Sequence, residues 1–390
     1  MPLSGIRVLD FSRHLPGPYA TDLLVRLGAE VIKVEPPDGD PTRWLPPFNG
    51  DYGALFVLIN GGKKSVVVDL KSEEGIAFVK RLATTCDVVV ESYRPGVMKQ
   101  FGVDANALME INPGLVYCSV SGFGQANPRS SHDLNFVALA GLLDLQRDRD
   151  GRPVLPATQS GDMAGALYAA LSIVAALYEK RTSGKGRVLD VAMSDATRAM
   201  MPTAEALYRG TQQRPEHFML TGALPAYNVY RTRDGKYLSV APLEPRFWEA
   251  FCNAIGHPDL IEKQYEESEK SALFETIAEA IGSKTRDEWE EVFAGIDACV
   301  EPVLTIDEAH QRLGDPNESH PLQRNFPRRT GSAEKLGASF EDVATQAGLT
   351  PGEVRSLRRS GHFEQQDKLQ RLVRNAVMKF RYRSLLGRSD

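Results

Sequence analysis

A histidine and an aspartate stand together at His132 and Asp133, after a glycine-bearing loop at residues 121–125. A histidine in a loop beyond a parallel β-strand lies where the catalytic groups of α/β enzymes collect, and imidazole exchanges protons readily near neutral pH. The alternative is structural, with Asp133 capping a helix over residues 134–145 and His132 packed beside it. The pair therefore indicates either acid–base chemistry or a helix start.

Asp162 and Glu244 are the other two acids placed for chemistry. Asp162 precedes the small and apolar residues from Met163 to Tyr178, which predict a buried helix. A carboxylate at the start of such a helix can act as a base or a nucleophile, whereas the structural alternative is a helix cap. Glu244 follows a predicted hairpin strand, and its alternative is a first-turn helix carboxylate.

Four cations lie near predicted loops and could form charge-assisted hydrogen bonds with phosphates. They are Lys63, Lys64, Lys71 and Arg94. For each of them the alternative is a solvated surface side chain. No cysteine or histidine spacing of the zinc type is present, so we expect no metal site.

Alternating strand and helix patterns must position these residues. Residues 6–11 predict a strand, a helix pattern ends at Gly28, and residues 29–34 predict a second strand. Further strands are predicted at residues 65–70, 86–91, 115–121 and 187–193. Such βαβ units predict an α/β, Rossmann-like, doubly wound parallel sheet. No G-x-G-x-x-G segment opens the first helix, which disfavours a nicotinamide or flavin dinucleotide.

The composition is that of a globular protein with a large core. The chain has 390 residues, of which 42% are hydrophobic and 25% charged, and a net charge of −5. These values exclude a disordered chain or a coiled coil and argue against a nucleic-acid binder. Four scattered cysteines, no visible signal peptide and an apolar run too short for a membrane span predict a cytoplasmic protein. Residues 351–390 carry an excess of basic side chains.

A set of ordered motifs resembles the superfamily of family III CoA-transferases and α-methylacyl-CoA racemases. The matching segments are residues 3–10, 16–18, 27–36, 69–71, 93–97, 122–125, 183–186 and 190–193. The resemblance implies a large CoA-binding, Rossmann-like domain at residues 1–200, completed by residues 311–390. Residues 201–221 would form a linker helix, and residues 222–310 a smaller α+β domain.

The resemblance also assigns chemistry. Asp162 falls on the superfamily's catalytic aspartate, and His132-Asp133 and Glu244-Pro245-Arg246-Phe247 match the racemase branch. That branch implies 1,1-proton transfer at the α-carbon of a 2-methylacyl-CoA, with His132 and Asp162 as the acid–base pair. The dimer of the family is interlocked, so Glu244 would come from the partner chain. The alternative is a CoA-transferase that acts through an aspartyl intermediate at Asp162, or a CoA-binding paralogue without activity.

CoA would be part of the substrate, with no separate cofactor. The resemblance places it near Asp69, Leu70, Lys71, Tyr93, Arg94, Ser131, Asp133, Leu134, Asn135 and Phe136. An enolate intermediate needs hydrogen-bond donors, which we expect from the loop at residues 122–125 or from the helix at Asp162.

Several positions depart from the family pattern. Pro36 and Gln100 stand where some racemases carry CoA-facing arginines, and the segment Asn60-Gly61-Gly62-Lys63 lacks its usual arginine. The basic tail at residues 364–390 extends beyond the family's usual end, and it either packs on the dimer or contacts an acidic partner.

Overall fold

The computed structural model describes residues 1–390 except 149, 214–218, 327–330 and 366–390, so the basic tail lies almost entirely outside the described residues. The chain forms two compact units. Unit 1 comprises Met1–Ala140, Pro156–Met200 and His320–Asp390, and unit 2 comprises Gly141–Leu155 and Met201–Ser319. Residues 141–155, 201–221 and 311–319 therefore group with unit 2, unlike the boundaries expected from the sequence.

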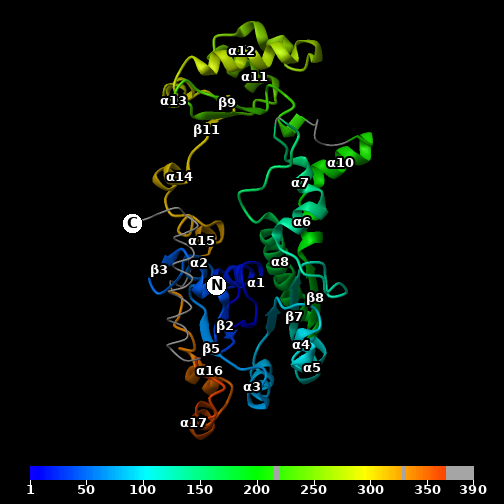
Figure 1. The fold of residues 1–390 in the computed structure, drawn as a ribbon, viewed down its shortest axis with the longest axis vertical. Helices are drawn as coiled ribbons and strands as arrows, with labels where there is room; N and C mark the ends of the chain where they lie inside the picture. The colour runs from blue at the N-terminus through cyan, green and yellow to red at the C-terminus, as the bar shows by residue number, and fades with distance from the viewer. Residues whose placement is uncertain (149, 214–218, 327–330, 366–390) are drawn as a thin grey trace. The chain divides into compact units, whose positions relative to one another are not determined.

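Unit 1 is built on a six-stranded parallel sheet (Figure 1). Its strands are β1 (Arg7–Asp10), β2 (Glu30–Glu35), β5 (Lys64–Val67), β6 (Val88–Glu91), β7 (Val116–Ser121) and β8 (Arg187–Ala192). Their spatial order is β5-β2-β1-β6-β7-β8, so the order reverses between β1 and β6. The predicted doubly wound α/β fold is confirmed.

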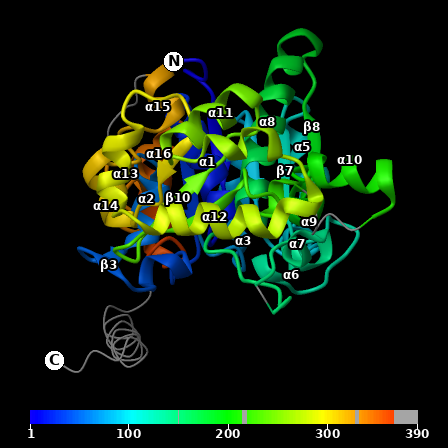
Figure 2. The same cartoon turned by 90° about the horizontal axis from the view of Figure 1, so that it is seen from above.

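Both faces of this sheet are buried by helices (Figure 1, Figure 2). Because side chains alternate along a strand, Val8 and Val88 face one layer while Leu9 and Val89 face the other. The first layer contains α1 (Pro16–Arg26) and α8 (Ser160–Ser183). The second contains α3 (Glu73–Ala83), α5 (Ala105–Ile111), α16 (Phe340–Gln346) and α17 (Pro351–Arg359). Valine is the commonest residue of β1, β2, β5, β6 and β7, whose positions are almost all buried, whereas the first part of β8 is largely exposed.

The C-terminal segment returns to complete the second layer. Phe340 and Phe363 pack their rings against Phe78 of α3, with centroids 5.5 and 5.3 Å away. The backbone N–H of Asp69 also donates to the carbonyl of His362 at 2.9 Å. Residues separated by most of the chain thus share one core.

Helix α8 is the central helix of the first layer. It packs against α1 and α9 (Met193–Ala199), and a Cβ at Gly165 would lie 2.6 Å from Cγ of Met193, so the helices approach closely there. By length and composition alone α8 could cross a membrane, but half of its most apolar stretch is buried in the unit. A helix buried in the core of a protein can have the same length and the same apolar composition.

The helix predicted over residues 134–145 is divided. Helix α6 spans Asp133–Ala140 and α7 spans Leu142–Leu145, because Gly141 adopts a left-handed conformation with φ 87°. The remaining elements of unit 1 are β3 (Phe48–Asn49), β4 (Tyr52–Gly53), α2 (Ala54–Asn60), α4 (Val97–Gln100) and α15 (Pro321–Asn325).

Unit 2 is an α+β unit with a three-stranded antiparallel sheet. Strands β9 (Asn228–Arg231), β10 (Tyr237–Val240) and β11 (Val300–Pro302) lie in the order β11-β10-β9. Helices α11 (Pro245–Ala254), α12 (Lys270–Gly282) and α13 (Arg286–Phe293) contribute to a core around Trp248 and Trp289. Helices α10 (Pro202–Thr211) and α14 (Ile306–Leu313) belong to the same unit.

Candidate active site

The starts of α6 and α8 are joined by one carboxylate. Oδ1 of Asp133, the first residue of α6, accepts hydrogen bonds from the backbone N–H groups of Gly161 (2.8 Å) and Asp162 (3.0 Å). Helix α8 has Gln159 at its N-cap position, without a side-chain cap of its own. The structural alternative for Asp162, a cap of its own helix, is therefore not what the structure shows: Asp133 supplies the acceptor for the two N–H groups at the start of α8.

This arrangement leaves the Asp162 carboxyl available. It lies at the third position of α8, and no described residue donates a hydrogen bond to it or pairs with it. Burial, and next the charge of Asp133, raise the pKa of Asp162 to about 7. A carboxyl group with a pKa near neutrality can both give and take a proton at physiological pH.

His132 immediately precedes α6 and is exposed. Its backbone is held by Asn135, whose Oδ1 accepts from the His132 N–H at 3.0 Å and whose N–H donates to the His132 carbonyl at 2.8 Å. Since His132 adjoins Asp133, the hydrogen bonds of Asp133 place His132 and Asp162 at the same junction of two helices.

His14 is a further histidine near this junction, and the sequence analysis missed it. It lies in the loop after β1 with a left-handed φ of 66°, which few residues other than glycine adopt. Desolvation lowers the pKa of His14, Asp40 opposes this effect, and the charges of Arg13 and His132 lower it further. Its place in the loop that follows β1 is the signal that could have identified it, since His132 likewise lies in the segment that follows β7.

Some of the backbone N–H groups that were expected to bind an enolate oxygen already donate hydrogen bonds within the structure. At the start of α8, Ser160 and Met163 donate to the carbonyls of Thr158 and Gln159, and the two N–H groups between them bind Asp133. The expectation that this helix supplies donors to a substrate is wrong in this conformation. In the glycine-bearing loop, Gln125 donates to Asp190 at 2.9 Å, whereas the N–H groups of Phe123 and Gly124 meet no acceptor within the described part of the chain.

A cavity of about 220 Å³ lies at the carboxyl ends of β1, β2 and β6. Asp69, Leu70, Lys71 and Tyr93, four of the residues expected near CoA, line it. Arg94 and Leu134 are exposed.

The other residues expected near CoA lie beside the glycine-bearing loop. A Cβ on Gly122 would approach Oγ of Ser131 to 2.5 Å, so this loop and the segment before His132 are in close contact. The buried Phe136 ring packs edge-on against Phe123, with a centroid distance of 5.6 Å.

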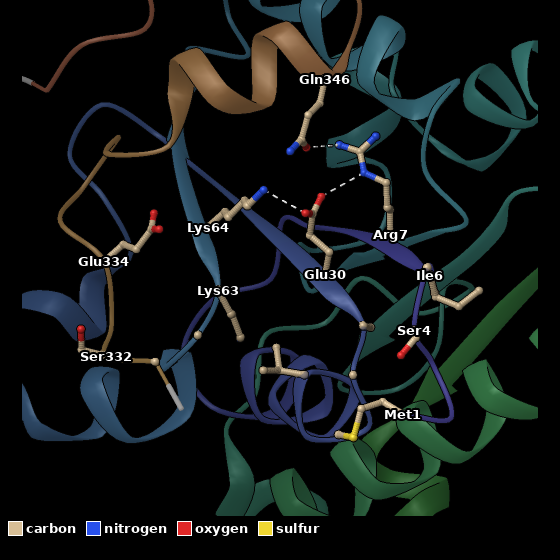
Figure 3. Close-up of a pocket in the computed structure, with 16 residues that line it drawn as sticks. Met1, Ser4, Ile6, Arg7, Glu30, Lys63, Lys64, Ser332, Glu334 and Gln346 are labelled. Atoms are coloured by element: carbon tan, nitrogen blue, oxygen red, sulfur yellow. Dashed lines mark hydrogen bonds and ion pairs between the residues drawn. The ribbon is translucent and has the colours of Figure 1, made fainter. Parts of the chain in front are cut away.

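Lys63 and Lys64 stand at the start of β5, and both are held by carboxylates of unit 1. Lys63 is buried, and its Nζ contacts Oδ2 of Asp10 at 3.2 Å, while Lys64 pairs with Glu30 at 2.8 Å and Asp342 at 2.7 Å. Both lysines line a larger cavity of about 1240 Å³ around the amino ends of β1, β2 and β5 (Figure 3). Because their charges are already compensated within unit 1, the structure disfavours the interpretation of these two lysines as phosphate-binding cations.

Glu244 is described with unit 2. It is exposed, directly precedes α11, and its side chain does not cap that helix. Desolvation and the charges of Asp297 and Glu244 raise the pKa of Cys299, so Glu244 lies close to the segment at residues 297–299. Within unit 2, the motif that begins at Glu244 thus lies beside the segment at residues 297–299.

Comparison with known proteins identifies the family. The model of CoA-transferase family III matches residues 3–341. The chain belongs to CoA-transferase family III. It is 33% identical to human α-methylacyl-CoA racemase over 318 residues, which cover 79% of each chain. It is also 34% identical to human succinyl-CoA:glutarate CoA-transferase over 306 residues, covering 75% of this chain and 70% of the relative.

A solved structure agrees with the family. The crystal structure of a CAIB/BAIF family protein from Brucella suis is 26% identical and superimposes with a TM-score of 0.76, covering 89% of this chain and 99% of that one. Because a racemase and a transferase of family III are equally similar in sequence, the choice between the two reactions depends on the site.

Proposed function

We propose that this family III enzyme is a racemase or epimerase, which interconverts the (R) and (S) forms of a 2-methylacyl-CoA by 1,1-proton transfer at the α-carbon. The observation that carries the proposal is the junction of α6 and α8. There, Asp133 fixes the backbone that carries two proton-transfer groups, the imidazole of His132 and the carboxyl of Asp162, whose pKa is raised to about 7.

The two groups act on opposite faces of the α-carbon. When neutral His132 removes the proton, the C–H bond breaks and its electron pair moves onto the thioester oxygen as an enolate. Protonated Asp162 then returns a proton to the other face, which leaves an imidazolium and a carboxylate. These two forms perform the reverse reaction, so each enantiomer is deprotonated by a different residue.

The enolate oxygen needs donors that are fixed before the reaction, each contributing ~3 kcal/mol. We assign this role to the N–H groups of Phe123 and Gly124, because other donors near the α8 start are already occupied. Glu244 is the third catalytic residue that we propose, supplied by a partner subunit and acting on the protonated form of His132.

The second candidate is a family III CoA-transferase, as in the human succinyl-CoA:glutarate relative. There, the Asp162 carboxylate would attack the thioester carbon, and His132 would have no part in the chemistry. A pKa of about 7 for Asp162 favours proton transfer over this role, because attack requires the ionised form.

Deuterium exchange separates the two reactions. The enzyme is incubated with a chiral 2-methylacyl-CoA in D2O, without any acceptor carboxylic acid. We expect deuterium at the α-carbon together with loss of optical activity. Asp162→Asn and His132→Ala should each lower exchange by about 10²- to 10⁴-fold while acyl-CoA still binds. An absence of exchange, with transfer of CoA to an added carboxylate, would reject the racemase and support the transferase.

A further inference from the structure

Arg13 of unit 1 carries a positive charge that has no role in the reaction proposed above. It follows β1 at the point where the strand order reverses, and its backbone is fixed by Ser92. The Arg13 N–H donates to Oγ of Ser92 at 2.9 Å, and this hydroxyl lies 3.4 Å from the Arg13 carbonyl. The side chain is therefore held between the carboxyl ends of β1 and β6.

The guanidinium of Arg13 has no anionic partner within the described residues. It lies over the ring of Tyr93, 4.2 Å from the centroid, and its Nε is buried without a hydrogen-bond acceptor. Other buried arginines of unit 1 are paired: Arg26 contacts Asp22 at 2.6 Å and Arg43 contacts Glu35 at 2.7 Å. A half-buried guanidinium that is stacked but unpaired is a site prepared for an anion from outside the chain.

The cavity beside Arg13 indicates which anion the guanidinium binds. Arg13 lines the 220 Å³ cavity together with Lys71, and Pro36 lies in the same wall. Pro36 stands where some racemases of the family carry a CoA-facing arginine, and the cations that line this cavity are Arg13 and Lys71. The acid nearest in sequence to Pro36, Glu35, is already bound by Arg43 and Ser65.

We propose that Arg13 binds a phosphate group of the CoA nucleotide and replaces the arginine that is absent at Pro36. The assignment rests on the proposed use of an acyl-CoA substrate, and it makes Arg13 a determinant of nucleotide affinity. Guanidinium forms two parallel hydrogen bonds with phosphate, and the stacked Tyr93 ring keeps its plane in one orientation.

Titration calorimetry of the full chain tests this assignment. The ligands are a 2-methylacyl-CoA, its 3′-dephospho form and the matching acyl-pantetheine, which has no phosphate. Arg13→Met should weaken acyl-CoA binding by about 10- to 100-fold and leave acyl-pantetheine binding unchanged. Arg13→Lys should restore part of the loss, because it keeps the charge but not the planar fork. Arg358→Met is the matched control, since Arg358 also lies over an aromatic ring, that of Phe340, but outside this cavity.

The outcomes are distinct. A loss seen for acyl-CoA but not for the dephospho form assigns Arg13 to the 3′-phosphate, whereas an equal loss for both assigns it to the diphosphate. An unchanged ratio of acyl-CoA to acyl-pantetheine affinity in Arg13→Met overturns the assignment, even when wild-type α-proton exchange upholds the proposed function. A wild-type protein that binds no acyl-CoA overturns both. Thermal melting of Arg13→Met and Arg13→Lys separates a binding defect from unfolding.

Discussion

Asp133 both positions Asp162 and raises its pKa. Its Oδ1 accepts a hydrogen bond from the backbone N–H of Asp162 at 3.0 Å, while its negative charge disfavours ionisation of the neighbouring carboxyl. One side chain therefore fixes where the proposed acid lies and contributes to the pH at which it gives up its proton.

Two substitutions at Asp133 separate these roles. Asp133→Asn keeps an acceptor oxygen but removes the charge, which lowers the pKa of Asp162, although burial keeps it above its usual value. For the enantiomer that Asp162 deprotonates, the acidic limb of the pH–rate profile should therefore move to lower pH. Asp133→Ala also removes the acceptor and should lower kcat by about 100-fold through misplacement of Asp162. The measurement is α-proton exchange between pH 5 and 9. Wild-type profiles in both variants would contradict the dual role.

Asp162 should also make unfolding pH-dependent. Its pKa is raised in the folded state to about 7, so between roughly pH 4 and 7 the folded chain binds more protons than the unfolded chain. This contribution to stability is present at low pH and is lost as the pH rises towards 7. Asp162→Asn should therefore melt a few degrees above wild type at pH 8, since 1 kcal/mol corresponds to roughly 2–4 °C. Asp195→Asn is the control, because Asp195 occupies the same position of α9 but is exposed. Equal melting temperatures of wild type and Asp162→Asn at pH 8 would contradict a buried Asp162 carboxyl with a raised pKa.

Substitution of Glu244 tests whether each active site contains residues from two subunits. Asp162→Asn and Glu244→Gln proteins should each be inactive, but co-expression should restore roughly a quarter of wild-type activity, because half of randomly mixed dimers carry one intact site of two. Each subunit is given a different affinity tag so that mixed dimers can be isolated. Full activity of Glu244→Gln alone would remove Glu244 from the mechanism, and inactive mixed dimers would place all catalytic residues of a site on one chain.

Lys63 and Lys71 should respond differently to the same change. Lys63→Met leaves Asp10 buried without its partner and should destabilise unit 1 by about 3–5 kcal/mol. Lys71 is exposed and lines the smaller cavity, so Lys71→Met should leave the denaturation midpoint near that of wild type and weaken acyl-CoA binding. Urea denaturation and calorimetry measure the two effects. A Lys63→Met protein of normal stability with impaired CoA binding would restore the role that the sequence suggested for Lys63.

The α/β fold could be predicted because the residue patterns that indicate it lie within short segments of the sequence. The βαβ pattern from residue 6 to residue 34 requires a parallel sheet, and the valine-rich strands indicate burial on both faces. The division of the helix at Gly141 was missed because an isolated glycine in an apolar pattern is compatible with a continuous helix, and only the left-handed φ separates α6 from α7.

The site depends on contacts that no local pattern contains. Asp133 caps a helix that begins far along the chain, so its sequence position suggested only its own helix as a target. Lys63 and Lys71 look equivalent in sequence, but one lies inside an ion pair and the other at a cavity. The positive φ of His14 is likewise visible only in the structure.

The return of the C-terminal segment to α3 has a consequence during synthesis. Phe78 leaves the ribosome long before Phe363, which completes its layer. At about 5–20 residues per second, the interval between residues 140 and 363 is roughly 10–45 s. Unit 2 is made within this interval and is free to fold first, while the part of the second layer that α16, α17 and Phe363 cover stays exposed. The nascent chain therefore presents a hydrophobic surface to chaperones until Phe363 has been synthesised.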